Sequence, residues 1–111
     1  MGENDKQVLG KIYKHIQSVL KYCSNCNSLS EFQLNSMMVE ACVFNLMQIG
    51  ELAKSSLSDE CKKEIKNIPW QQIYGMRNRI VHGYSGVDLN IVWSTIQEDL
   101  PMLRDEIAAI L

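Results

Sequence analysis

The sequence contains no run of about 18 or more apolar residues, which is the length that a membrane-spanning helix needs. Residues 1–6 also lack the apolar core of a secretory signal peptide. We therefore expect a soluble, cytoplasmic protein without a membrane partner. An excess of positive charge is missing as well. Because the formal net charge is −2, any contact with nucleic acid must be local rather than spread over the surface.

Patterns typical of metal sites and of disulfide-linked folds are also missing. No cluster of Asp and Glu has the spacing of Mg²⁺ or Ca²⁺ ligands. Cys23 and Cys26 have the spacing of half a zinc site, but no second pair follows, and Cys42 lies in an apolar helical run. Disulfides need a secreted context, so we expect four free thiols, no metal and no cofactor.

What the sequence does contain is enough apolar residues for one core. Its 111 residues are 46% hydrophobic and 22% charged, which predicts a single domain over residues 1–111. No segment alternates apolar and polar residues as a half-buried strand does, whereas apolar residues often recur at steps of three and four. The fold class is therefore all-α, a bundle of four to five helices that run up and down.

Caps and apolar stripes place the first three helices. The first helix begins after Asp5, which can cap it. The second begins at the capping box Ser28-Leu-Ser-Glu31 and continues to about Lys54. A short third helix, Asp59 to Lys66, follows the capping residue Ser58.

Two longer helices follow in the C-terminal part of the chain. Pro69 fits the first turn of the fourth helix, and Gly83, in the left-handed conformation, closes it. Residues 84–87 then form a turn, and Asp88 caps the fifth helix. The apolar stripe of this helix continues in register beyond Pro101, so the proline should kink the helix rather than end it.

The second helix is apolar nearly all round. Phe44, Leu46 and Met47 lie off its main stripe. In so short a chain, this pattern indicates burial against a second copy as well as against the protein's own core. The alternative is a central helix in a monomeric bundle. The main stripe consists of Leu34, Met38, Ala41, Cys42, Ile49 and Leu52.

Arg77 is a charged residue on an otherwise apolar helix face. On a wheel of about 100° per residue it lies near the centre of that face. An unpaired guanidinium cannot be buried there, because the group stays charged. Arg77 is therefore either a functional cation or a structural residue paired with Glu40 or Glu51, which share a face of the second helix. The other members of the face are Trp70, Ile73, Tyr74, Ile80 and Val81.

Asn78 and His82 lie one helical turn apart and can contact each other. Arg77 and His82 differ by about 140° on an ideal helix, so they converge on one ligand only where the helix unwinds, and Gly83 supplies such an ending. The C-terminal end of a helix favours the imidazolium form of His82. Tyr84 adds a nearby phenol.

Together these groups suit attack of a ribose 2′-hydroxyl on the adjacent phosphate of RNA. Arg77 can hold the phosphate through two hydrogen bonds, His82 can transfer a proton, and Asn78 can orient the imidazole, all without a metal. Each residue also has an ordinary explanation. His82 can be a helix-end histidine, Tyr84 a core aromatic residue, and Asn45 a buried residue that hydrogen-bonds across a dimer contact.

The segment Arg77-Asn-Arg-Ile-Val-His82-Gly-Tyr84 resembles the signature of the HepT-like HEPN family: Arg, four residues, His, one residue, Tyr. The resemblance extends over roughly residues 5–110. The chain differs from many members in its acidic charge and at positions 36 and 37, where Ser and Met replace a frequent Arg-Asp pair. Three further segments match in order and spacing: Asn45-Leu-Met-Gln-Ile-Gly-Glu51, Ile68-Pro-Trp70 and Glu98-Asp-Leu-Pro101.

This resemblance implies a HEPN-type bundle with a kinked last helix, which forms a homodimer through its central helices. The Arg/His motifs of both subunits would line one cleft. Arg77 would stabilise the phosphate, His82 would be the general acid or base, and Asn78 would be the polar residue beside the motif arginine. Family members are toxins that cleave RNA. A small nucleotidyltransferase antitoxin of the MntA type neutralises them by attaching AMP to the tyrosine that corresponds to Tyr84.

We therefore expect a homodimeric, metal-independent endoribonuclease of a toxin–antitoxin pair, with RNA as its substrate and an MntA-like nucleotidyltransferase as its partner. The main alternative is a catalytically inactive HEPN domain that binds a nucleotide or docks the nucleotidyltransferase. A helical bundle with a purely structural role is the third hypothesis.

Overall fold

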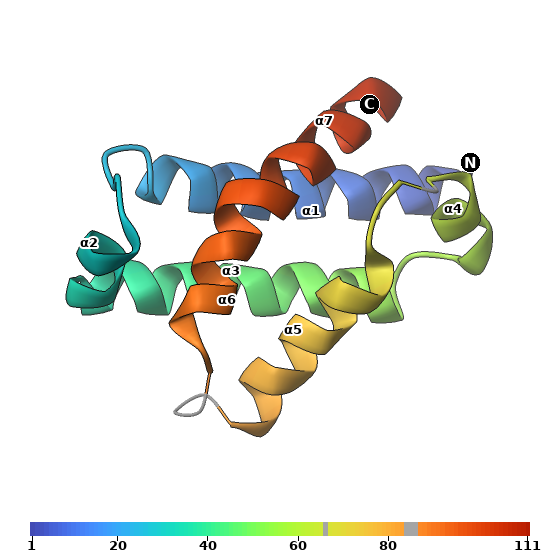
Figure 1. Cartoon of the computed structure of the whole chain (residues 1–111). Helices are drawn as coiled ribbons and strands as arrows, with labels where there is room; N and C mark the ends of the chain where they lie inside the picture. The colour runs from blue at the N-terminus through green and yellow to red at the C-terminus, as the bar shows by residue number, and fades with distance from the viewer. Residues whose placement is uncertain (66, 84–86) are drawn as a thin grey trace.

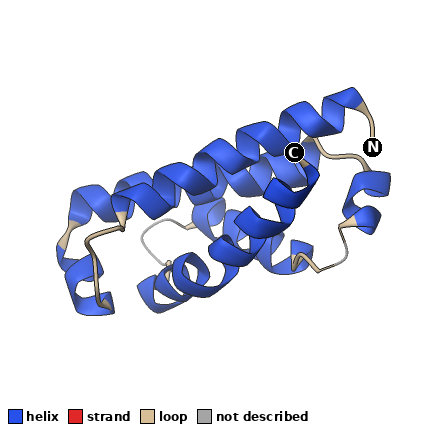
Figure 2. Cartoon of the chain, turned by 90° about the horizontal axis from the view of Figure 1, so that it is seen from above, coloured by secondary structure: helices blue, strands red, loops and turns tan. Residues whose placement is uncertain are grey.

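The computed structural model describes residues 1–65, 67–83 and 87–111, and only the backbone of His82. Every regular element in these ranges is helical (Figure 2), which confirms the all-α prediction. None of these helices has the length and apolar character needed to cross a membrane. The elements are α1 (Glu3–Tyr22), α2 (Leu29–Leu34), α3 (Ser36–Ser55), α4 (Asp59–Glu64), α5 (Trp70–His82), α6 (Leu89–Ser94), the π-helical segment η2 (Thr95–Asp99) and α7 (Leu100–Ile110).

The two longest helices, α1 and α3, lie side by side and run in opposite directions (Figure 1). α5 packs against α3, and the C-terminal helices α6 and α7 cross over the α1–α3 pair (Figure 1). Apolar side chains from all these helices form one buried core, as the predicted helical bundle requires. Its largest fully buried side chains are Phe32, Leu9, Ile12, Ile16, Ile49, Ile96, Leu103 and Ile107.

The second predicted helix is in fact two helices. Ser28 caps α2 as expected, because its hydroxyl accepts a hydrogen bond from the Glu31 amide at 3.2 Å. At Asn35 the backbone leaves the helical conformation, and the Asn35 side chain accepts a hydrogen bond from the Met38 amide at 3.0 Å. Asparagine is a strong N-cap residue, so it starts α3 here. The single predicted helix is therefore wrong, and Leu34, expected in its buried stripe, is 87% exposed.

Asp5 does not cap α1, contrary to the prediction. The helix begins at Glu3, and Asp5 lies in its first turn. The Asp5 carboxylate instead accepts hydrogen bonds from the amide and hydroxyl of Ser58, at 2.9 and 2.6 Å. The Ser58 hydroxyl, followed by the Ser58 amide, lowers the pKa of Asp5 below its usual value. Ser58 also caps α4 as predicted, by accepting from the Cys61 amide at 3.1 Å, so this pair joins the start of α4 to α1.

The ends of α4 and α5 differ from the predictions. α4 ends at Glu64, and Lys66, its predicted last residue, lies outside the described residues. Pro69 directly precedes α5 instead of occupying its first turn. Gly83 closes α5 as predicted, but its φ of −175° is extended backbone, so the left-handed conformation expected there is wrong. Of the predicted turn at 84–87, the residues 84–86 lie outside the described ranges.

The last predicted helix continues through Pro101 to Ile110, as expected, and Asp88 caps its start. Its geometry changes from α to π in η2, which ends two residues before the proline. A proline removes one helical hydrogen bond, and its ring clashes with the preceding turn. A wider π turn at this point relieves that clash, which explains how the helix continues across Pro101.

Candidate active site

The centre of the candidate site is the crossing of α3 and α5, where the two helices approach closely. Gly50 of α3 faces Arg77 of α5. A β-carbon at position 50 would collide with the β-carbon of Arg77 and lie 3.0 Å from its γ-carbon. It would also lie 3.3 Å from the backbone oxygen of Ile73. The absence of a side chain at Gly50 therefore allows Arg77 to lie against α3.

Arg77 forms an ion pair with Glu51, the residue that follows Gly50. Its Nε donates a hydrogen bond to Oε2 of Glu51 at 2.7 Å, and its Nη1 donates to Oδ1 of Asn78 at 2.9 Å. The Arg77 and Glu51 side chains are 20% and 45% exposed. Of the two acidic partners considered from the sequence, Glu51 is thus the one that Arg77 contacts, at the edge of the protein rather than deep in its core.

The Arg77 guanidinium has more hydrogen-bond donors than its contacts with Glu51 and Asn78 use. A guanidinium has five N–H donors. Within the described ranges the Nη2 group has no acceptor, and no buried side-chain nitrogen or oxygen there lacks a hydrogen-bond partner. The Arg77 side chain is 20% exposed, and a guanidinium with donors left over can bind phosphate or carboxylate oxygens.

His82 is the last residue of α5, and its side chain lies outside the described residues. The Gly83 amide donates to the Arg79 carbonyl at 3.1 Å, so helical hydrogen bonding extends past His82. The unwinding that would let Arg77 and His82 converge within one chain does not occur. Their positions remain about 140° apart around the helix.

Asn78 is brought together with Arg77. The Asn78 side-chain oxygen accepts a hydrogen bond from the Arg77 guanidinium, whereas the predicted contact of Asn78 with the His82 side chain lies outside the described residues. Tyr84, the predicted modification site, lies outside the described residues. Of the four predicted site residues, the structure therefore describes the side chains of Arg77 and Asn78, and it adds Glu51 as the ion-pair partner of Arg77.

An apolar groove of about 430 Å³ lies on the same α3–α5 face. Met47 and Val81 are each one helical turn from the Glu51–Arg77 pair. Phe44 and Val81 are 54% and 46% exposed, which is high for large apolar side chains. The groove is lined by Glu40, Val43, Phe44, Met47, Ile80 and Val81.

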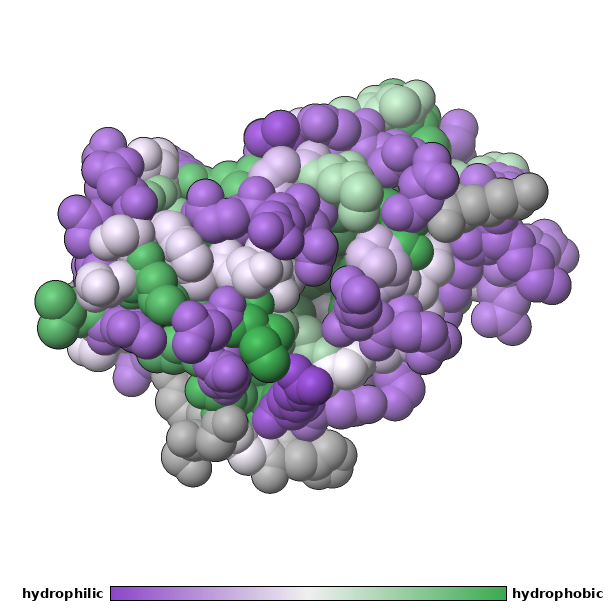
Figure 3. All heavy atoms as spheres, viewed as in Figure 1, coloured by the Kyte–Doolittle hydropathy of each residue, from purple (hydrophilic) through white to green (hydrophobic). Residues whose placement is uncertain are grey.

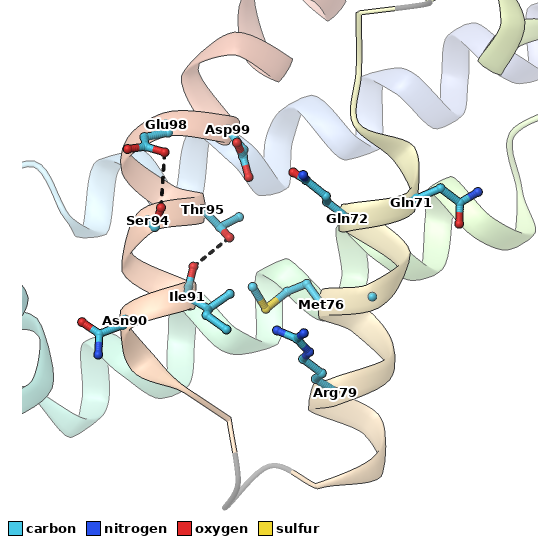
Figure 4. A pocket seen from close by; sticks show the side chains of 11 residues that line it. Gln71, Gln72, Met76, Arg79, Asn90, Ile91, Ser94, Thr95, Glu98 and Asp99 are labelled. Carbon is cyan, nitrogen blue, oxygen red and sulfur yellow. Dashed lines mark hydrogen bonds between the residues drawn. The ribbon is translucent and has the colours of Figure 1, made fainter.

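A second hollow, of about 700 Å³, opens between α5 and the α6–η2 segment (Figure 3). Arg77 is not among the residues that line it. Arg79 enters it near one end, and Gln72 and Asp99 face each other near the other end (Figure 4). The sequence analysis did not indicate this cleft. Arg79 of the signature segment and Glu98 and Asp99 line it, but nothing in the spacing of these segments indicates a pocket.

One end of this cleft carries acidic side chains, Glu98 and Asp99, whereas the centre of the candidate site is the cation Arg77. Burial raises the pKa of Asp99 above its usual value, and the neighbouring Glu98 carboxylate raises it further. The cleft therefore places two acidic groups at the end opposite to Arg79 (Figure 4). In the part of the chain that the structure describes, no three His, Cys, Asp or Glu side chains are grouped as ligands for a metal ion.

Asn45 hydrogen-bonds within the chain, which contradicts its interpretation as a dimer contact. Its Oδ1 lies 2.8 Å from Nδ1 of His15 on α1, and its Nδ2 donates to the Ala41 carbonyl at 2.8 Å. Asn45 is 8% exposed. Its polar atoms are thus satisfied by α1 and α3, and they require no second subunit.

Comparison with known proteins adds a family to this geometry. Residues 12–110 match the family model described as Ribonuclease HepT-like. The chain is 34% identical over 84 residues to a protein of Caldanaerobacter subterraneus subsp. tengcongensis named a putative RNase, covering 76% of this chain and 74% of that one. It is 28% identical over 102 residues to a putative RNase of Methanocaldococcus jannaschii, with 92% of each covered.

A third relative, from Thermococcus cleftensis, bears the name probable ribonuclease HepT. It is 38% identical to this chain over 56 residues, which is 50% of each protein. No solved structure gives a significant match.

Proposed function

The chain belongs to the HepT-like family, and from this premise we propose that it is a metal-independent endoribonuclease, the toxin of a toxin–antitoxin pair. Two kinds of observation support the proposal. Relatives that align over most of the chain are named putative RNases. The residues of the family signature that the structure describes include a partly exposed cation, Arg77.

That cation, Arg77, is the observation that carries the proposal. Glu51 accepts a hydrogen bond from its Nε, which restricts the guanidinium plane, and the Arg77 side chain remains 20% exposed. A positioned, partly exposed guanidinium can bind two oxygens of a phosphodiester and stabilise the charge that develops on them in the transition state. In a ribonuclease without a metal ion, a side chain must provide this stabilisation of negative charge.

The proposed reaction is an internal transesterification. The 2′-oxygen attacks the adjacent phosphorus, the bond from phosphorus to the 5′-oxygen breaks, and a 2′,3′-cyclic phosphate and a 5′-hydroxyl form. A base takes the proton of the 2′-hydroxyl, and an acid gives a proton to the leaving 5′-oxygen. His82 fills one or both of these roles, and Arg77 with its neighbour Asn78 holds the phosphate.

The active unit is proposed to be a homodimer joined through the α3–α5 face. Two observations favour it. The positions of Arg77 and His82 are about 140° apart on α5, so a site that needs both is more easily built from two chains than from one. The exposed side chains of Phe44 and Val81 form an apolar groove beside Arg77 that a second copy would cover.

The proposed antitoxin is a small nucleotidyltransferase that transfers AMP from ATP to the hydroxyl of Tyr84, with release of pyrophosphate. The added phosphate would compete with RNA for the guanidinium of Arg77. Co-expression with such an enzyme should add the mass of one AMP to the chain. Tyr84→Phe should prevent the mass increase, and the toxin should then remain active beside the enzyme.

A second function is favoured by the same ion pair. Glu51 already pairs with Nε of Arg77 and so neutralises part of the charge that would bind a phosphate. The alternative function is therefore that of an inactive HEPN domain, which only binds a nucleotide or docks the nucleotidyltransferase. Such a domain would bind ATP or the partner and cleave no RNA.

Expression of the chain alone in a bacterial host tests the toxin hypothesis. Growth should slow, and Arg77→Ala or His82→Ala should restore it. Arg104→Ala is the matched control, because Arg104 pairs with Asp105 on the surface, with 37% of its side chain exposed, and should leave the toxicity intact. Normal growth with the wild-type chain, at equal protein levels, favours the inactive domain.

The dimer is tested by sedimentation of the purified protein. The wild type should sediment as a dimer and Phe44→Glu as a folded monomer, because a carboxylate cannot be buried unpaired in an apolar contact. A wild type that is monomeric at all concentrations would contradict the dimeric site.

A further inference from the structure

Cys23 and Cys42 bring two thiols into contact between α1 and α3, away from the Arg77 site. Their sulfur atoms lie 3.6 Å apart, and the residues are only 7% and 0% exposed. The cysteines are free in this structure. We propose that Cys23 and Cys42 are a redox modification site, at which a peroxide generates a reversible disulfide that ties the end of α1 to the middle of α3.

The position of Cys23 makes the bond geometrically accessible. A disulfide has a sulfur–sulfur distance of about 2.05 Å, so the two sulfur atoms must approach by roughly 1.5 Å. Cys23 is the residue that ends α1, and its backbone is no longer helical (φ −95°, ψ 6°). Helix ends open more easily than helix centres, so both the movement and the entry of a small oxidant occur on the Cys23 side. Cys42 stays fixed within α3.

The two thiols are not equivalent chemically. The hydrogen bond between them lowers the pKa of Cys23 and raises that of Cys42. Cys23 is therefore the thiol that more readily loses its proton, and the thiolate is the form that reacts. The same residue is the more exposed of the two.

The oxidation balances with hydrogen peroxide as the oxidant. The Cys23 thiolate attacks one peroxide oxygen, the O–O bond breaks, and with one proton a sulfenic acid and a water form. The Cys42 sulfur then attacks the Cys23 sulfur, the S–O bond breaks, and a second water leaves with the Cys42 proton. Two thiols lose two electrons in total, and the peroxide is reduced to two waters.

Cys26 is the competing partner for Cys23. Its amide donates to the Cys23 carbonyl at 3.0 Å, so the two residues share a tight turn. However, its thiol is directed to the Ser28 carbonyl, at 3.6 Å, and burial raises its pKa. Cys61 is buried in α4 and, within the described ranges, has no sulfur at hydrogen-bonding distance, which makes it the matched control.

The test is treatment of the folded full-length chain with a small excess of hydrogen peroxide at neutral pH, followed by thiol counting and peptide mapping. The wild type should lose two of its four thiols and yield a Cys23–Cys42 peptide pair. A thiol reductant should reverse both changes. The disulfide closes a loop of 19 residues, so the oxidised protein should melt roughly 5–15 °C higher. Cys61→Ser should give the same linkage, and Cys42→Ser should not.

Three results would overturn the proposal. The wild-type map could show Cys23 joined to Cys26, the thiols could resist peroxide until the protein unfolds, or the product could be an irreversible sulfinic acid. The wild-type map decides among these even if Cys42→Ser does not fold. The growth assay tests the proposed ribonuclease activity separately. The disulfide proposal and the ribonuclease proposal can therefore fail independently of each other.

Discussion

Gly50 and Arg77 touch across the α3–α5 crossing so closely that position 50 has no room for a β-carbon. Gly50→Ala should therefore push α5 away from α3 and disturb the Arg77–Glu51 pair. Overpacking of this kind costs about 1–3 kcal/mol of unfolding free energy. Urea denaturation followed by circular dichroism measures the loss.

Gly75 provides the control for this substitution, because none of the described atoms lies within 4 Å of a β-carbon placed there. Gly75→Ala should instead stabilise the protein by about 0.5–1 kcal/mol, since alanine has the higher helix propensity. If Gly50→Ala were equally stabilising, the close helix contact would be wrong.

Glu51 is expected to matter more for activity than for stability. The Arg77–Glu51 pair is partly exposed, so Glu51→Gln should change the unfolding free energy by less than about 1 kcal/mol. It should lower the rate of RNA cleavage by roughly 10- to 100-fold, because the guanidinium loses the partner that positions it. The measurement is the RNA cleavage rate of Glu51→Gln. The control is Asp105→Asn, which removes the partner of Arg104 and should leave the rate unchanged. Unchanged or faster cleavage by Glu51→Gln would show that the pair does not position Arg77.

The caps show what local sequence predicts well. Ser28, Ser58 and Asp88 each cap the expected helix, because an N-cap hydrogen bond joins residues only two or three positions apart. Asn35 has the same chemistry, but it lies between two apolar segments that read as one stripe, and so the break between α2 and α3 was not predicted. Asp5 resembles a cap by its position before the first apolar stripe. Its actual partner, Ser58, is 53 residues away, and a local pattern cannot indicate so distant a contact.

The site was predictable in its residue types and not in its contacts. The apolar face around Arg77 indicated that the arginine is paired or functional, and the alternative partners Glu40 and Glu51 share one helix face. The close approach of α5 to α3 at Gly50 places Arg77 beside Glu51 rather than Glu40, and this approach depends on tertiary packing. The cleft near Asp99 depends on how the C-terminal helices pack against α5, which no local pattern records.

Asp5 should make stability depend on acidic pH. Its pKa is lowered in the folded protein by the two hydrogen bonds from Ser58. Its contribution to stability is therefore complete above the pKa of an ordinary aspartate, about 4, and is lost as the pH falls through the lowered value. The stability difference between wild type and Asp5→Asn, measured by urea denaturation, should shrink from about pH 5 to about pH 2. A constant difference over this range would contradict the proposed carboxylate contact.

Asp99 should have the opposite effect. Burial and the nearby Glu98 raise its pKa in the folded protein, so ionised Asp99 opposes folding. This penalty is absent below the usual aspartate pKa and is complete above the raised one. Asp99→Asn should therefore raise the melting temperature at pH 7 and give little gain at about pH 3. An equal gain at both pH values would mean that charge is not the cause.

The most direct test of the ribonuclease is cleavage of a defined single-stranded RNA by the purified protein in excess EDTA, with analysis of the product ends. The wild type should cleave and leave 2′,3′-cyclic phosphates and 5′-hydroxyls, while folded Arg77→Ala should be slower by roughly 100- to 1,000-fold. Failure of the folded wild-type protein to cleave in EDTA, or equal cleavage by Arg77→Ala, would contradict a metal-independent site built on this arginine.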